Sequence, residues 1–353
     1  MEKNMEVKKK KIVREFILST INGMTFGLFA TLIIGTIIAQ IATVFVDTTV
    51  FEVINTTANT LKALTGVGIG VSIALTLKQT GIRFVSVAVA GAIATSFVIT
   101  SNGFEAKLNI DPVITYLVVI GCALFVKFVF AKKTNFDIIL VPLSSAILAM
   151  LITAGLSFPV TFIIRQIADF ITAATNLLPI PMSILISVVM GMTLTGPISS
   201  LAISLAINLG GIAAGAAVIG CSTQMVGFAV QSIRDNKTGD VLSIMFGTSM
   251  LQLKNVIKKP VIWLPTIIAS AIIGPIGTMI FKLESNSVGG GMGTSGLVGP
   301  LQTLEIMGYS SIAFWGVGIC LFLLPAVLVF IIDLLFRKLK LIKENDFVIE
   351  SSF

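Results

Sequence analysis

The sequence predicts an all-α, polytopic membrane protein with about eight to ten transmembrane helices plus re-entrant hairpins. Two features of the composition lead to this prediction. Hydrophobic residues make up 55% of the 353 residues and charged residues only 12%, about half of the share in an average soluble domain. Because a membrane helix needs about 20 apolar residues, the longest stretches without any charge can cross a bilayer. These stretches are 16–46, 84–104, 138–164, 170–233, 260–281 and 306–332.

The distribution of Lys and Arg predicts how the chain is oriented. When both termini are placed on the cytoplasmic side, every basic residue lies on that side except Lys62, Lys107, Arg165 and Lys282. This asymmetry satisfies the positive-inside rule and predicts that both termini are cytoplasmic. The same rule accounts for the net charge of +7, so we expect membrane lipid and no nucleic acid among the partners.

The first part of the chain predicts a long helix, an interfacial helix and a short helix. A basic lead-in, 1–15, precedes a helix over 16–46 that is either tilted or broken near Asn22-Gly23, because it exceeds about 20 residues. The polar segment 47–64 predicts an external interfacial helix. The short helix over 65–77 is rich in glycine, which is typical either of a discontinuous transporter helix or of close helix packing. Its glycines are Gly66, Gly68 and Gly70.

Three further helices and a connector are predicted next. Helices over 84–100, 112–132 and 137–158 cross the membrane, and a connector over 160–176 lies along the membrane plane. The connector has Arg165 and Asp169 four positions apart, which places both on one helix face. An outer loop between the first two of these helices contains Glu105, Lys107 and Asp111.

The segment before Arg234 allows two topologies. Either 179–209 is a hairpin that turns at Thr195-Gly196-Pro197 and one crossing follows, or three segments cross. After Asp240, the charge-free segment 241–253 is too short to span.

We expect three regions along the chain. They are the cytoplasmic lead-in (1–15), a single transmembrane domain (16–336) and a cytoplasmic tail (337–353). Near the end of the domain, Asp333 and Arg337 lie one helical turn apart and predict an ion pair at the inner rim.

A glycine-rich stretch from Glu284 to Glu305 separates two apolar helices and has no charge between these two acids. Irregular backbone at membrane depth requires protein or a water-filled cavity to satisfy its polar groups, so we predict a re-entrant loop at a solute path. The stretch contains Gly293-Thr294-Ser295, and the same three residue types occur at Gly247-Thr248-Ser249. These two GTS segments lie on opposite sides of the helix over 260–281, which predicts an inverted repeat.

The candidate solute site consists of uncharged polar residues of the second half and two acids. Amides and hydroxyls suit a neutral polyhydroxyl ligand, because each sugar hydroxyl both donates and accepts. The alternative is that these residues only join helices to one another. Glu305 is the better candidate for accepting a proton or a hydroxyl, since Glu284 can pair with its neighbour Lys282. The predicted solute-binding residues are Asn208, Ser222, Gln224, Thr248, Ser249, Gln252, Asn286, Gly293, Thr294, Ser295, Gln302, Glu284 and Glu305.

Motifs for other chemistry do not occur in the sequence. The chain has no histidine, its three cysteines lie singly in apolar stretches, and it has no Walker A sequence, GxSxG motif or metal-ligand cluster. We therefore expect no catalytic residue, no metal and no cofactor.

Five short motifs follow one another along the chain: Thr195 to Ser200 (TGPISS), Gly220 to Phe228 (GCSTQMVGF), Gly247 to Met250 (GTSM), Lys259-Pro260, and Gly296 to Pro300 (GLVGP). Together they resemble the small enzyme IIC-like proteins of the phosphotransferase system, a group that includes membrane proteins of the perfringolysin-regulator type. The resemblance implies a homodimeric permease whose helices and re-entrant hairpins enclose a sugar. It also implies that a separate IIB protein, which works with a IIA protein, phosphorylates this sugar. Many members place a His and a Glu near the sugar, and this chain has no His.

The sequence thus predicts a permease of the enzyme IIC type that moves a small polar solute, most simply a carbohydrate. Its part in any enzymatic reaction would be that of the membrane component of a sugar phosphotransferase. Two alternatives are open. One is a membrane sensor that acts on a cytoplasmic partner through 234–240 and the basic tail; the other is an ion-coupled secondary carrier without phosphorylation.

Overall fold

The computed structural model describes residues 2–45, 48–100, 103–106, 108, 111–132 and 134–349. Nearly all of its elements are helices, which confirms the all-α fold class; the exception is one two-stranded hairpin. Two compact units are present, one formed by Met1–Gly35 and Thr56–Thr161 and the other by Thr36–Asn55 and Phe162–Phe353. Among the residues named above, Asp47 and Lys107 lie outside the described residues, as do the last residues of the tail, 350–353.

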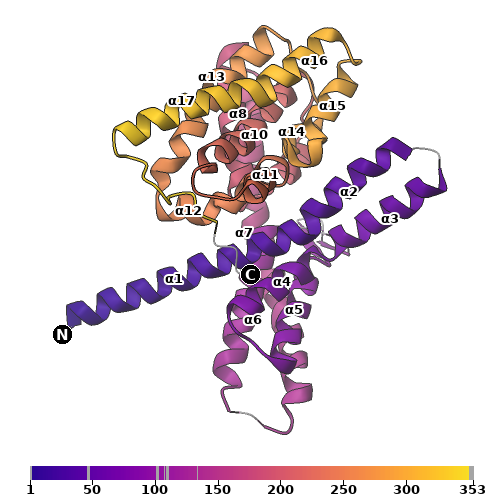
Figure 1. Cartoon of the computed structure of the whole chain (residues 1–353). Coiled ribbons are helices and arrows are strands. Elements are labelled where there is room, and N and C mark those ends of the chain that lie inside the picture. Colours follow the sequence, from indigo (N-terminus) through magenta and orange to yellow (C-terminus); the bar gives the residue numbers. More distant parts are fainter. Residues whose placement is uncertain are drawn as a thin grey trace. The chain divides into compact units, whose positions relative to one another are not determined.

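The first unit is a group of helices that pack on α4 (Figure 1). Helix α4 contacts α1, α5 and α6. The elements of this unit are α1 (Glu2–Leu28), the π-helical turn η1 (Phe29–Ile33), α4 (Thr65–Thr76), α5 (Gly81–Ala94), β1 (Val98–Thr100), β2 (Gly103–Glu105) and α6 (Pro112–Val129). The elements that run across the division between the units are α2 (Ile34–Ala42), α3 (Thr49–Ala63) and α7 (Asp137–Thr175), and the 3-10 turn η2 (Thr43–Phe45) belongs to the second unit.

Of the two alternatives for the first helix, tilted or broken near Asn22-Gly23, the structure does not support a break at these residues. Helix α1 continues through these residues to Leu28, and the departure from regular α-helix is the π-helical turn η1 that follows. Gly23 instead permits close packing, because a Cβ atom there would lie only 3.1 Å from the carbonyl oxygen of Ser72 in α4. The glycine therefore brings two helices together without interrupting its own.

The glycines of α4 also serve close packing. A Cβ at Gly66 would overlap the carbonyl oxygen of Gly91 in α5, and a Cβ at Gly70 would lie 2.8 Å from the Cα of Ala88. The predicted short helix is confirmed, with α3 and α4 bent by 48° where they meet. Of the two interpretations of these glycines, the contacts favour small-residue packing.

The helix predicted over 84–100 ends earlier than expected. Helix α5 stops at Ala94, and β1 and β2 then pair antiparallel, with Val98 opposite Glu105. The β-branched run Val98-Ile99-Thr100, followed by Ser, Asn and Gly, favours a strand and a turn over a helix. Asp111, expected in the outer loop, caps α6 by accepting from the N–H groups of Val113 and Ile114.

The predicted division between a crossing and a connector at Phe158 is also wrong. Residues Asp137–Thr175 form the single 39-residue helix α7, with Pro142 and Pro159 inside it. A helix of this length extends about 58 Å, well beyond the hydrocarbon thickness of a bilayer. Proline is tolerated inside long membrane helices, so Pro159 does not end this one.

The second unit is organised around α10, which contacts α8, α13, α14 and α17 (Figure 1). Helix α10 is buried over nearly all of its length from Ala214 to Ser232. The elements of this unit are α8 (Pro179–Thr195), α9 (Ser200–Ala206), α10 (Gly211–Ser232), α11 (Thr238–Phe246), η3 (Ser249–Gln252), α12 (Leu253–Lys258), η4 (Pro260–Trp263), α13 (Leu264–Met279), α14 (Ser287–Met292), η5 (Ser295–Leu297), α15 (Val298–Ile306), α16 (Ser311–Val317), the π-helical turn η6 (Gly318–Leu323) and α17 (Leu324–Lys338).

Six helices in the described part of the chain are long and apolar enough to cross a membrane. The bent pair α3 and α4 makes seven if it forms one span, and α5 and α8 are shorter apolar helices. The structure therefore supports a polytopic membrane protein, and the count of eight to ten crossings stays a prediction. Helix α9 has only seven residues, about 10 Å, so the alternative with three separate crossings before Arg234 is not supported.

Candidate functional site

Helix α10 can be buried on all sides because small residues let its neighbours approach. A Cβ at Gly220 would overlap the carbonyl oxygen of Ser187 in α8, and a Cβ at Gly215 would overlap that of Leu283. The helix nevertheless has three consecutive polar residues in its middle, Ser222, Thr223 and Gln224, and all three are fully buried. Buried polar side chains are costly unless they are hydrogen-bonded, so their partners decide what this region does.

Gln224 is the centre of a hydrogen-bonded cluster. Its side-chain oxygen accepts from the indole N–H of Trp263 at 2.9 Å, from the hydroxyl of Thr266 at 2.8 Å and from the hydroxyl of Thr195 at 3.3 Å. Thr195 also shares a hydrogen bond of 2.8 Å with Ser249. These five residues, which we call the Gln224 cluster, come from α8, α10, η3, η4 and α13.

The orientation of the Gln224 amide follows from Trp263. An indole N–H can only donate, so the atom that faces it must be the amide oxygen. The amide nitrogen, Nε2, then points away from these donors, and it has no hydrogen-bond partner although it is buried. The hydroxyls of Ser222 and Thr223 are likewise buried and unpartnered. This part of α10 therefore presents unused donors and acceptors inside the protein.

The two GTS segments have the same order of secondary-structure elements. In each, a helix ends at the Gly, the Thr follows, a 3-10 turn begins at the Ser, and another α-helix comes directly after. The first segment connects α11 to η3 and α12, and the second connects α14 to η5 and α15. The hydroxyl of Thr248 caps η3 by accepting from the N–H of Met250 at 3.1 Å. The order of elements therefore matches, but the backbone does not, because Gly247 has a φ of −100° and Gly293 a φ of +55°, and Thr248 is extended whereas Thr294 is not.

The two GTS segments also meet at α10. The hydroxyl of Thr294 donates to the carbonyl oxygen of Met245, at the end of α11, over 2.6 Å and lies 3.4 Å from the sulfur of Met225 in α10. Gly293 has a φ of +55°, and a Cβ there would lie 2.7 Å from that of Cys221. Ser295 is buried and its hydroxyl is unpartnered. Residues from both segments therefore lie against the polar middle of α10.

Three of the predicted residues form a separate chain of hydrogen bonds. Asn286 caps α14 by accepting from the N–H of Gly289, and its amide nitrogen donates to the side-chain oxygen of Gln302. The amide nitrogen of Gln302 donates in turn to Glu305 at 3.0 Å. Glu305 is exposed, so this chain of bonds runs from the start of α14 to the protein surface.

Two predicted residues form no side-chain hydrogen bond with either group. Asn208 is exposed at the turn between α9 and α10, with a φ of +48°. Glu284 is partly exposed, and it does not pair with Lys282. The backbone of Leu283, the residue before Glu284, packs on α10 at Gly215.

Gln252 faces the end of the chain. Its amide nitrogen donates to the carbonyl oxygen of Phe347 at 2.9 Å, and its oxygen accepts from Asn255 at 2.7 Å. Ser249 and Gln252, at the two ends of the four-residue turn η3, thus have different neighbours. Only Ser249 belongs to the Gln224 cluster.

Sequence reasoning missed Trp263 and Thr266. The available signal was the indole itself, because a partly buried Trp in an apolar environment needs an acceptor for its N–H, and Gln224 was a predicted site residue. Their positions directly after Lys259-Pro260 made both look like ordinary residues of an apolar helix.

Comparison with known proteins identifies the family. A family model described as "Phosphotransferase system, EIIC" matches residues 18–349, which include α10 and both GTS segments. Comparison with curated proteins and with solved structures gave no match. The chain belongs to the phosphotransferase system EIIC family and is a multi-pass membrane component of a transporter of this type.

Proposed function

We propose that this protein is a permease that carries a small polar solute, a carbohydrate, past the middle of α10. The observation that carries the proposal is the buried and unpartnered amide nitrogen of Gln224. An unpaired buried polar group costs about 1–3 kcal/mol, so native proteins retain one where water or a ligand can complete its bonding. Ser222, Thr223 and Ser295 add three more such groups from α10 and the second GTS segment.

The chemistry of these groups supports a neutral, hydroxyl-rich solute. The Gln224 cluster and the unpartnered hydroxyls of Ser222, Thr223 and Ser295 comprise one amide, one indole and several hydroxyls, without a charged member. Each sugar hydroxyl can accept from the Gln224 amide and donate to a serine or threonine oxygen. The ring of Trp263 adds an apolar face of the kind that packs against a sugar ring.

We propose that the two GTS segments are re-entrant elements that enclose this site. Their shared order of helix, Gly-Thr, 3-10 turn and helix supports a repeat, which we propose to be inverted. In this arrangement Asn286, Gln302 and Glu305 form a polar route from the site to one surface, with Glu305 accepting from a solute hydroxyl at its outer end. Asn208 and Glu284 would line that outer end as well.

Phosphorylation would depend on other proteins. The 353 residues contain no histidine, and we propose that a IIA protein carries the phosphohistidine and that a IIB protein transfers the phosphoryl group to the solute. The distribution of basic residues supports cytoplasmic termini, which places the IIB partner on the side of α17 and the tail. We further propose a homodimer in the cytoplasmic membrane of a bacterium.

Uptake into proteoliposomes with a panel of radiolabelled sugars tests this proposal. The expected result is accumulation of one sugar class that increases when phosphorylated IIB is enclosed with the protein. Parallel vesicles with a proton or sodium gradient and no IIB test the carrier alternative. If no sugar binds or accumulates under any of these conditions, the carbohydrate permease proposal fails.

A further inference from the structure

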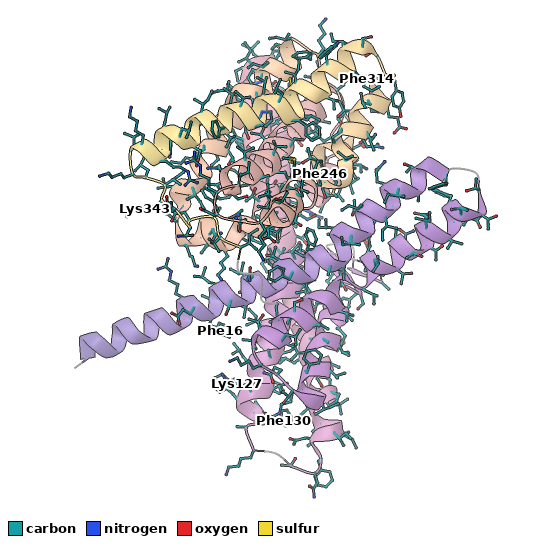
Figure 2. The ribbon with its side chains drawn as sticks, viewed as in Figure 1. Phe16, Lys127, Phe130, Phe246, Phe314 and Lys343 are labelled. Carbon is teal, nitrogen blue, oxygen red and sulfur yellow. The ribbon has the colours of Figure 1, made fainter. Side chains whose placement is uncertain are left out.

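The chain after α17 folds back onto the unit that contains α10. The segment 343–349, which we call the strap, begins at Lys343 (Figure 2) and is hydrogen-bonded to residues that follow α10 and to residues of η3 and α12. Its Phe347 is completely buried, with its ring 6.4 Å from that of Phe228 in α10 and 5.6 Å from the guanidinium carbon of Arg337. An aromatic side chain of the tail is therefore inserted among the helix ends.

Side chains of the second unit bind the backbone of the strap. Asp235 accepts from the N–H of Phe347 at 3.1 Å, and Asn236 both donates to the carbonyl oxygen of Phe347 at 2.7 Å and accepts from the N–H of Ile349 at 2.8 Å. Gln252 donates to the same carbonyl oxygen at 2.9 Å. Two further contacts are the bond from Asn255 to the carbonyl oxygen of Val348 at 3.0 Å and the 2.5 Å ion pair of Lys259 with Asp346.

The turn η3 joins the strap to the Gln224 cluster. Ser249, at its first position, bonds Thr195, and Gln252, at its last position, bonds the strap. A 3-10 turn of four residues has few internal hydrogen bonds, so its position depends on the groups that hold its two ends. Loss of the strap removes the support at one end and leaves the bond to Thr195 as the main constraint at the other.

We propose that the strap is a positioning element that fixes η3 and thereby sets the geometry of the Gln224 cluster, with Phe347 as its anchor. This inference rests on the proposed function only for the effect on solute binding; its effect on the cluster itself needs no solute. The second unit holds the strap mainly through hydrogen bonds to the backbone of the strap. Release of the strap would therefore loosen the Gln224 cluster without unfolding the helices.

Trp263 provides a direct readout. The chain has two tryptophans, and Trp315, on α16, is 69% exposed, so Trp315→Phe leaves Trp263 as the only emitter. In this background, a protein that stops after Ile342 lacks the strap, and a protein that stops after Ile349 retains it as the matched control. We expect a red-shifted Trp263 emission and about tenfold weaker sugar binding, the equivalent of one hydrogen bond, in the shorter protein only.

Two full-length variants test the same proposal in case the protein that stops after Ile342 does not fold. Phe347→Ala and Asn236→Ala keep the full chain, and both are expected to shift the Trp263 emission, whereas Phe347→Leu should largely retain the parent spectrum. A synthetic peptide with the sequence of residues 343–349, added to the protein that stops after Ile342, should restore the emission. The same peptide with Ala in place of Phe347 should not.

The possible outcomes separate the two proposals. Parent emission in folded Phe347→Ala and Asn236→Ala proteins overturns the positioning role of the strap, whatever the sugar binding. Shifted emission together with a lack of sugar binding by the full-length protein supports the strap and contradicts the permease proposal. Restoration by both peptides would mean that the anchor is not Phe347, and this would overturn the assignment.

Discussion

The indole N–H of Trp263 donates to the side-chain oxygen of Gln224, and this single contact fixes which end of the amide is free. The donor comes from the turn before α13 and the acceptor from the middle of α10, so the contact also joins two of the helices that form the unit. Because the oxygen faces Trp263, the amide nitrogen of Gln224 is the atom without a partner. The expected effects of a substitution at Gln224 depend on this assignment.

Replacement of Gln224 by Met should weaken solute binding by about tenfold or more, since it removes a donor while it keeps the length of the side chain. It should also lower the thermal stability in detergent, because Trp263 and Thr266 lose their acceptor. Sugar binding and thermal unfolding measure the two effects.

The matched control for this change is Gln231→Met, two turns further along the same helix. Gln231 is buried and donates to Asp333 at 3.2 Å, so its loss should reduce stability and leave solute binding unchanged. Equal sugar affinity of the two variants would contradict a special role for Gln224.

Three glycines with positive φ form a graded stability series. A Cβ added at Gly308 would meet open space, and one added at Gly296 would lie 3.2 Å from the side chain of Ile37. A Cβ added at Gly293 would lie within 3 Å of backbone and side-chain atoms of Cys221. Substitution by Ala at Gly308 should cost about 1 kcal/mol for the backbone conformation alone, and the cost should rise through Gly296 to Gly293. Thermal unfolding of the three variants gives the order. A Gly293→Ala protein as stable as Gly308→Ala would show that the second GTS segment can move away from α10.

The sequence predicts the helical class, the short glycine-rich helix and the ion pair of Asp333 with Arg337, because each depends on local composition or helix spacing. It does not predict that α7 is continuous through Pro159, since a proline in an isolated sequence indicates a helix end and only the surrounding helices make its interior position tolerable. The hairpin after α5 was missed because an apolar, β-branched run has no helical or strand period of its own.

The candidate site also has features that the sequence predicts and features that only the structure shows. The GTS match and Gln224 are visible in the sequence, and the structure brings them together at α10. The partners Trp263 and Thr266 and the separate role of Gln252 at the strap depend on contacts between residues 39 to 95 positions apart in the chain. Spacing along a single element does not determine such contacts.

Gly220→Ala should prevent close packing of α10 against α8, because the new methyl group would overlap the carbonyl oxygen of Ser187 and neither backbone can yield without moving a helix. The expected result is little or no folded protein, measured as the monodisperse fraction in size-exclusion chromatography. Gly239→Ala, in α11 with open space around it, is the control and should be neutral or slightly stabilising, since Ala favours helix by up to about 1 kcal/mol. Normal yields of both variants would contradict the close packing.

The pair formed by Asp333 and Arg337 should behave as a buried ion pair in a double-substitution experiment. The carboxylate accepts from the guanidinium at 2.6 Å, and both side chains are nearly buried. Asp333→Leu alone leaves the guanidinium without its partner and should cost about 3–5 kcal/mol, whereas Asp333→Leu combined with Arg337→Met should recover much of this loss, because no uncompensated charge remains. Thermal unfolding of the single and double variants in detergent measures the difference. Recovery should stay incomplete, since Arg337 also lies against Phe347 and donates to the carbonyl oxygen of Gln231. A double variant no more stable than Asp333→Leu alone would mean that the unpaired charge is not the source of the loss.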